Sequence, residues 1–131
     1  MTDEEMIAVL RRFHDAFNRG DVEAVVQLVH PDMELVRAGG MSSIKGVDAL
    51  RKWMEPDAIE EARAEPLDFR VNGEKVFVRE HVTGRGTGSG IEIDAVTYIV
   101  WTLDDHGLVR EAQAFLPHEE AEALEAAGLS E

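Results

Sequence analysis

The 131-residue sequence contains no cysteine, which excludes disulfide bonds, thiolate metal ligands and cysteine nucleophiles. It is also poor in positive charge: 13 Lys and Arg residues stand against 27 Asp and Glu residues, for a formal net charge of −14. Because phosphate groups are bound through clustered Lys and Arg, this balance argues against nucleic acid and anionic membrane as partners. No apolar run approaches the roughly 18 residues of a membrane-spanning helix.

Residues 1–5 are acidic and lack the basic and then apolar order of a signal peptide. We therefore expect a cytoplasmic protein. What the sequence does contain is an ordinary globular balance, with 44% hydrophobic and 31% charged residues. Its length fits one domain with a real core, and we expect that single domain to span residues 1–131.

Three helices are expected in the first half of the chain. Thr2 and Glu5 form a capping box for the first one. Its apolar stripe recurs at helical spacing, in Met6, Leu10, Phe13 and Phe17. Asp21 caps a second helix, which continues to Val29 and is broken by residues 30–32, because proline cannot continue a helix. A third helix follows Gly46 and ends near Pro56.

Strands are predicted for residues 33–38, for the segment from about 62 to 71, and for residues 75–86, 91–103 and 108–116. In the second of these, Leu67, Phe69 and Val71 alternate with polar residues and should share a face. Asn72 and Gly73 predict a hairpin turn. Residues 118–128 complete the chain as a short helix rich in alanine and glutamate.

This order of elements, together with five short motifs, resembles the SnoaL-like branch of the NTF2-like superfamily. The motifs are residues 17–21 (FNRGD), 30–32 (HPD), 46–50 (GVDAL), 105–109 (DHGLV) and 121–129 (AEALEAAGL). The resemblance implies an α+β, NTF2-like cone: a curved antiparallel (mixed) sheet with three N-terminal helices packed on its concave face. It also implies a pocket between sheet and helices, and a homodimer through the outer sheet face.

Fold alone does not transfer an activity, so the known sites of the superfamily must be matched residue by residue. The tyrosine of the ketosteroid isomerases corresponds to Phe13, their base to Arg37 or Ala38, and their second oxyanion donor to Ile99. None of these residues can perform the corresponding role, so the sequence excludes that chemistry.

Two further sites of the superfamily are also missing. The Arg-x-Asp pair and the further aspartate of the limonene-epoxide hydrolases correspond to Glu80, Val82 and Ala114. The acid of SnoaL-type polyketide cyclases falls among residues 112–114, where none is present. The resemblance therefore implies the fold without assigning a reaction.

One acidic residue interrupts an otherwise apolar strand face. Alternate residues of a strand point to the same side, so Val76, Val78, Glu80 and Val82 share the face that should point inward. A carboxyl group in such a row suits general acid–base work. The alternative is a structural glutamate, exposed at an edge or paired with an arginine such as Arg37.

The expected pocket is mostly apolar, as small-molecule sites usually are. Its lining is predicted to comprise Phe13, Phe17, Leu35, Trp53, Val78, Thr97, Ile99, Trp101, Ala112, Ala114 and Leu116. Its polar groups would be Glu80, Thr97 and Arg37. His14 lies beside the stripe of the first helix and either reaches the pocket or sits at its boundary. The alternative is that these side chains fill the space completely.

Two hypotheses follow. In the first, the protein binds a small apolar or aromatic molecule and Glu80 acts as general acid or base, oriented by Arg37 or His14, in an isomerisation, dehydration or cyclisation. In the second, it is a non-catalytic binding or dimerisation module with a structurally paired Glu80. No cofactor or metal is expected, because no histidine pair has the i, i+4 spacing of a zinc site and no H-E-x-x-H motif occurs.

Overall fold

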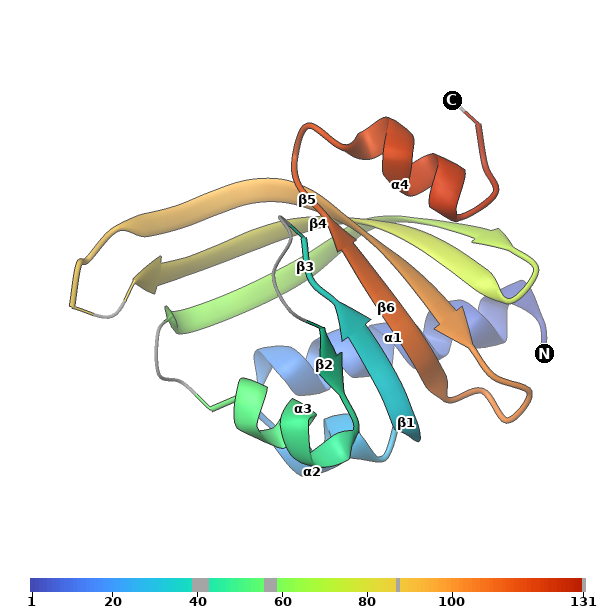
Figure 1. Ribbon diagram of the computed structural model, residues 1–131, viewed down its shortest axis with the longest axis horizontal. Coiled ribbons are helices and arrows are strands. Elements are labelled where there is room, and N and C mark those ends of the chain that lie inside the picture. Colours follow the sequence, from blue (N-terminus) through green and yellow to red (C-terminus); the bar gives the residue numbers. More distant parts are fainter. Residues whose placement is uncertain (39–42, 56–58, 87, 131) are drawn as a thin grey trace.

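The computed structural model describes residues 1–38, 43–55, 59–86 and 88–130, and for residues 59–61 the backbone only. Its helices and strands are shown in Figure 1. In chain order they are α1 (Asp3–Asn18), α2 (Val22–Val26), β1 (Val29–Val36), β2 (Ile44–Lys45), α3 (Val47–Trp53), β3 (Ile59–Asn72), β4 (Lys75–Gly86), β5 (Glu92–Leu103), β6 (Val109–Phe115) and α4 (Glu120–Ala126).

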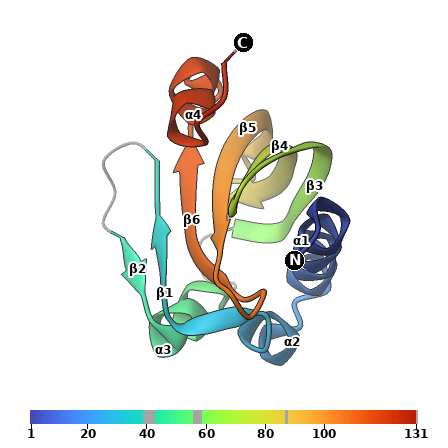
Figure 2. The same cartoon turned by 90° about the vertical axis from the view of Figure 1, so that its right-hand side faces the viewer.

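The strands form one sheet in the order β2-β1-β6-β5-β4-β3. β1 and β6 pair in parallel and the other neighbours pair antiparallel, so the sheet is mixed. The sheet curls, and α1 lies along its concave side while α4 lies on the opposite side (Figures 1 and 2). α2 and α3 close the end of the concave side near β1 and β2. This is the α+β cone with three N-terminal helices that the resemblance implies.

Local sequence signals explain where the first helix and the central hairpin begin and end. The Thr2 side chain accepts the amide of Glu5, and the Glu5 side chain accepts the amide of Thr2, so the first turn of α1 is capped in both directions. The turn between β3 and β4 uses Gly73 at φ 64°, a backbone conformation that glycine adopts without steric cost.

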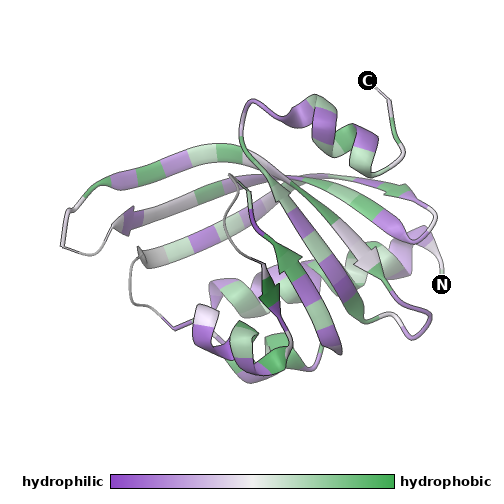
Figure 3. Cartoon of the chain, in the orientation of Figure 1, coloured by the Kyte–Doolittle hydropathy of each residue, from purple (hydrophilic) through white to green (hydrophobic). Residues whose placement is uncertain are grey.

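The main core lies between α1 and the concave face of the sheet. The alternation of hydrophobic and hydrophilic residues along the strands is visible in Figure 3. On β4, Val76 and Val78 point into this core and are completely buried, whereas Phe77 points to the opposite face. Leu10 and Phe13 of α1 pack against this inward row.

A second, smaller core lies on the outer face beneath α4. It contains Phe77, Tyr98 and Val100 of the sheet and Ala123, Leu124 and Ala127 from the C-terminal helix and its end. The Asn72 side chain donates to the carbonyl groups of Ala127 and Gly128, and Lys75 donates to the carbonyl of Ala126. These bonds satisfy the last carbonyls of α4, which no helical amide can reach. α4 therefore occupies one half of the outer sheet face.

Two predicted boundaries were wrong near residue 30. α2 ends at Val26 rather than Val29, and residues 30–32 lie inside β1 rather than before it. Pro31 is tolerated there because the pairing of β1 with β6 shifts register between Val29 and Glu34, so no ladder hydrogen bond needs its missing N–H.

The prediction for Leu67 was also wrong. Leu67 is 49% exposed and does not share the inward face of Phe69 and Val71. The register of β3 with β4 shifts between Pro66 and Asp68, so Leu67 is the extra residue of a β-bulge. β3 also begins at Ile59, earlier than predicted, and the two-residue strand β2 was not predicted.

Candidate functional site

The inward-facing side chains divide the cone into a closed end and a half-exposed end. Directly opposed residues on neighbouring strands share a face, which places Val82, Ala95, Thr97, Ile99 and Ala114 in the same inward rows as the core. At the closed end the inward residues are buried, namely Val76, Val78, Trp101, Leu103 and Ala112. At the other end they are half-buried, namely Val82, Ala95, Thr97, Ile99 and Ala114.

Glu80 and His14 lie at the boundary between these two ends, in direct contact. Glu80 is 1% exposed and is the last buried inward residue of β4. His14 is 3% exposed and sits on α1, two turns after Met6. Nε2 of His14 hydrogen-bonds Oε1 of Glu80 across 66 residues of sequence. Among the described residues, they are the buried side chains that can carry a charge near neutral pH.

The backbone of α1 fixes the tautomer of His14. Nδ1 lies 2.7 Å from the carbonyl oxygen of Leu10, and a carbonyl only accepts, so Nδ1 carries a hydrogen. The hydrogen bond between Nε2 and Oε1 then requires one further proton, held by either partner. The pair is therefore an imidazolium with a carboxylate, or an imidazole with a carboxylic acid, and it is neutral overall in both forms.

The environment favours the protonated imidazole. Burial alone would lower the pKa of His14, but the hydrogen bond to Glu80, the negative charge of Glu80 and the Leu10 carbonyl together outweigh it. The net result is a pKa of His14 raised above its usual value of 6.5. The raised pKa therefore favours the form of the pair in which His14 carries both ring protons.

Two polar atoms of this region have no hydrogen-bond partner among the described residues. One is the second carboxylate oxygen of Glu80, Oε2. The other is the indole nitrogen of Trp101, which is completely buried. The Trp101 ring lies 5.5 Å from the His14 ring and 4.8 Å from the Phe13 ring, both edge-on. The site thus offers a free acceptor and a free donor beside the His14–Glu80 pair.

Aromatic side chains continue from the pair toward the half-exposed end. Phe17, one turn after His14 on α1, is half-buried and stacks on Trp53 at the end of α3, with ring centroids 5.9 Å apart. Trp53 is 40% exposed, so it lies at the surface rather than inside the cone. The Asn18 side chain holds the end of α1 to β3 by two bonds to the backbone of Ala64.

The structure gathers most residues that the sequence singled out. Phe13, Leu35, Val78, Trp101 and Ala112 are buried in the main core, and Thr97 lies directly opposite Glu80 on the neighbouring strand. Ile99, Ala114 and Leu116 are half-buried. Of the two candidate partners of Glu80, His14 makes the hydrogen bond, while Arg37 follows β1 and is half-buried. Sequence reasoning missed the free indole donor, because nothing in a sequence shows whether a buried N–H finds an acceptor.

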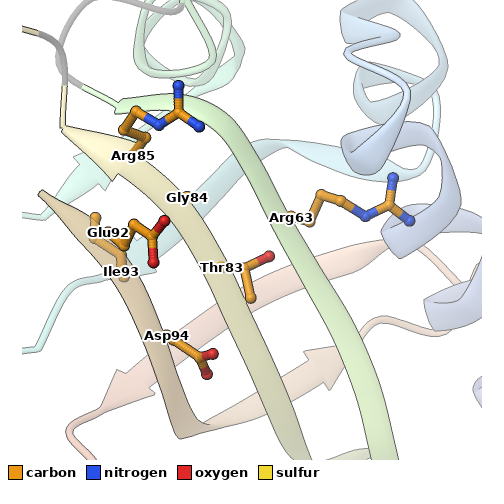
Figure 4. A pocket seen from close by; sticks show the side chains of 7 residues that line it. All are labelled: Arg63, Thr83, Gly84, Arg85, Glu92, Ile93 and Asp94. Atoms are coloured by element: carbon orange, nitrogen blue, oxygen red, sulfur yellow. The ribbon is translucent and has the colours of Figure 1, made fainter. Parts of the chain in front are cut away.

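Two surface hollows lie outside this region. One, of about 430 Å³, is formed on the ends of β3, β4 and β5 by Arg63, Thr83, Gly84, Arg85, Glu92, Ile93 and Asp94 (Figure 4). Asp94 of this hollow also pairs with His81, at 2.7 Å. The other, of about 240 Å³, lies beside Met1 and Asp104. Neither hollow contains a residue that the sequence predicted for the ligand site.

The part of the chain that the structure describes holds no cluster of three or more His, Asp or Glu side chains that could bind a metal ion. Within the same residues, no helix is both long and apolar enough to cross a membrane.

A curved mixed sheet wrapped around a capped helix places the chain in the class of cone-shaped α+β proteins. Residues 10–112 match the SnoaL-like domain family, and the chain belongs to that family. No curated protein matches the chain significantly.

Solved structures with the same fold span nearly the whole chain. A candidate polyketide cyclase from Sinorhizobium meliloti is 26% identical, with a TM-score of 0.69, covering 82% of this chain and 93% of its own. An NTF2-like protein of unknown function from Burkholderia pseudomallei is 21% identical, with a TM-score of 0.78, covering 95% and 97%. SalBIII, an epoxide hydrolase/cyclase-like enzyme with a role in pyran ring formation in salinomycin, is 20% identical, with a TM-score of 0.78, covering 88% and 93%.

Proposed function

We propose that this SnoaL-like protein binds a small apolar or aromatic molecule in the half-exposed end of the cone and transfers a proton on it with Glu80. The observation that carries the proposal is the buried His14–Glu80 pair, whose Oε2 has no partner among the described residues. A buried carboxylate normally has its oxygens hydrogen-bonded. An unpaired oxygen beside apolar and aromatic side chains suits a reacting group that arrives with a ligand.

The pair can move one proton without any other reagent. Oε2 of Glu80 accepts a proton from one atom of the ligand and returns it to another atom of the same ligand, which is an isomerisation. If the proton returns to a hydroxyl group that leaves, the products are an alkene and water, which is a dehydration. His14 keeps its own protons throughout and stabilises the carboxylate, so it acts as a positioning residue. Catalytic acids and bases are commonly placed in such environments.

The location of the ligand can be tested by filling the proposed space. Ala114 points inward and is half-buried, whereas its neighbour Gln113 points to the outer face. Binding of a panel of one- and two-ring aromatic molecules would be measured by thermal shift and titration calorimetry. We expect Ala114→Phe to weaken binding at least tenfold and Gln113→Phe, a matched substitution on the other face, to leave it unchanged. Equal binding by both variants would place the ligand elsewhere.

The chemistry can be tested without knowing the natural substrate. A proton shuttle should catalyse exchange of deuterium from D₂O into C–H groups next to a carbonyl in an aromatic ketone that binds, observed by proton NMR. Glu80→Gln keeps the shape of the side chain, and its amide can still donate to Nε2 of a neutral His14, so folding should be retained. We expect that variant to lose catalysed exchange. Exchange at the wild-type rate in Glu80→Gln would refute the role of Glu80.

The second candidate function is a non-catalytic binding or dimerisation module. The same ion pair favours it, because Glu80 and His14 would then simply tie α1 to β4. This function predicts no exchange catalysis in the wild-type protein and a loss of stability as the effect of replacing either partner.

We also propose a homodimer through the half of the outer sheet face that α4 leaves uncovered. Val96 lies on that half, directly opposite His81 of β4, and is 37% exposed. The nearby hollow carries two arginines and two acids, Arg63, Arg85, Glu92 and Asp94 (Figure 4). A surface with both signs of charge can complement its own copy across a two-fold axis.

A further inference from the structure

The indole nitrogen of Trp101 is a hydrogen-bond donor buried without an acceptor among the described residues. Trp101 is 4% exposed and lies on the inward face of β5, opposite Ala112 and Val76. Indole N–H groups can only donate, and buried ones usually have a partner. Leaving a buried donor unsatisfied is destabilising, so such an atom in a folded protein calls for an explanation.

Two acceptors of the cluster around His14 are already in use. The Leu10 carbonyl accepts from Nδ1 of His14, and Oε1 of Glu80 bonds Nε2 of the same ring. The Trp101 ring packs edge-on against both His14 and Phe13, so it belongs to the same cluster as the pair. A phenylalanine at this position would supply an aromatic ring without burying an unpaired donor.

We propose that Trp101 determines ligand specificity: its indole N–H donates to an acceptor oxygen of the bound molecule. The ligand class is then an oxygen-bearing aromatic or alicyclic molecule, such as a ketone, rather than a hydrocarbon of the same shape. This inference rests on the proposed function, because it assumes that a ligand enters the cone beside Glu80. It adds a requirement that the apolar lining does not impose, namely an acceptor atom at one defined place.

The proposal also predicts how the ligand is oriented. Glu80 on β4 lies directly opposite Thr97 on the neighbouring strand β5, and Trp101 lies four residues further along β5 toward the closed end, with Ile99 between them on the same face. A molecule that satisfies both unpaired atoms carries its acceptor oxygen toward the closed end of the cone and a proton-bearing atom toward Oε2. Because the indole nitrogen is sealed in the ligand-free protein, binding must displace neighbouring side chains.

The experiment uses pairs of probes that differ only in the acceptor oxygen. Acetophenone is compared with ethylbenzene, and 1-tetralone with tetralin, each titrated into ¹⁵N-labelled protein. The chain has two tryptophans, so two indole N–H signals are expected, and Trp53→Phe assigns them. We expect the ketone of a pair to bind about five- to tenfold more tightly than its hydrocarbon, the equivalent of one net hydrogen bond. We also expect the ketone alone to move the Trp101 signal downfield.

The variants separate this inference from the proposed function. In Trp101→Phe the preference for the ketone should disappear while the hydrocarbon still binds, and in Trp53→Phe, the matched control, the preference should persist. Equal binding of ketone and hydrocarbon by the wild-type protein, or a preference that survives in Trp101→Phe, would overturn the role of Trp101 but not the pocket. Failure of all four probes to bind would overturn both. If Trp101→Phe does not fold, the shift of the wild-type indole signal decides the question alone.

Discussion

Replacing His14 with leucine would leave the Glu80 carboxylate buried without its partner. Breaking a buried ion pair on one side costs about 3–5 kcal/mol, because an uncompensated charge stays in the interior. Replacing Glu80 with valine is milder, about 1–3 kcal/mol, because His14 can become neutral and only its Nε2 loses a partner. If the two losses were independent, the double variant would be destabilised by about 4–8 kcal/mol.

The structure predicts a different result for the double variant. Both groups touch one another and both are almost completely buried, so removing both leaves no unpaired polar atom from the pair. A hydrophobic replacement of similar volume is then tolerated at a cost of under about 1.5 kcal/mol. The free energy of unfolding, measured by urea titration at pH 7 with circular dichroism, should therefore show a coupling of about 2.5 kcal/mol or more between the two positions.

The His81–Asp94 pair is the matched control for this cycle. Its distance of 2.7 Å is that of a normal hydrogen bond, but its side chains are 36% and 75% exposed. Exposed pairs of this kind contribute about 0–1 kcal/mol, so the cycle of His81→Ala and Asp94→Ala should give a coupling below 1 kcal/mol. Additive losses for His14 and Glu80, within about 0.5 kcal/mol, would refute the reasoning about the buried pair.

Three further predictions follow from individual contacts. Because the folded-state pKa of His14 is raised, the stability that its charged form contributes is fully present below about pH 6.5 and is lost as the pH rises through the raised pKa. Urea unfolding from pH 6 to 9 should show this loss in the wild-type protein but not in the His14→Leu/Glu80→Val double variant. Equal dependence of the unfolding free energy on pH in the two proteins would contradict this prediction. Asn18→Ala removes two hydrogen bonds, of 3.0 and 2.8 Å, to the backbone of Ala64. It should lower the free energy of unfolding by about 1–3 kcal/mol. A loss below about 0.5 kcal/mol would show that these bonds do not hold α1 to β3. Val96→Asp should convert the proposed dimer to a monomer in analytical ultracentrifugation, because it places a charge in the interface. The control Leu67→Asp, at another exposed apolar residue, should leave the protein dimeric. A dimer that persists in Val96→Asp would place the interface elsewhere.

The regular parts of the fold were predictable from the sequence because local signals dominate there. The capping box of Thr2 and Glu5 marks the start of α1, and the Asn72–Gly73 turn marks the end of β3. β4 was predicted with its observed limits, and the alternation of Val76, Phe77 and Val78 assigns each residue to the correct face. Side-chain periodicity and turn chemistry need no knowledge of distant residues.

Features that depend on pairing between distant segments were not predictable. The bulge that exposes Leu67 arises from the register of β3 against β4, and β2 has only two residues, too few for a pattern. Glu80 was correctly placed on the inward face, but its hydrogen-bond partner could not be chosen between Arg37 and His14, because the contact joins segments 66 residues apart. The unpaired indole nitrogen of Trp101 depends on the positions of all its neighbours.

The most direct test of the central claim is a crystal structure of the protein purified without removal of bound small molecules, or soaked with the aromatic ketone that binds best. The account predicts electron density for a ligand in the half-exposed end of the cone, with one atom within hydrogen-bonding distance of Oε2 of Glu80. A cone filled by its own side chains, with Phe17 and Ile99 closed over the His14–Glu80 pair and no ligand beside Oε2 in the soaked crystal, would contradict it.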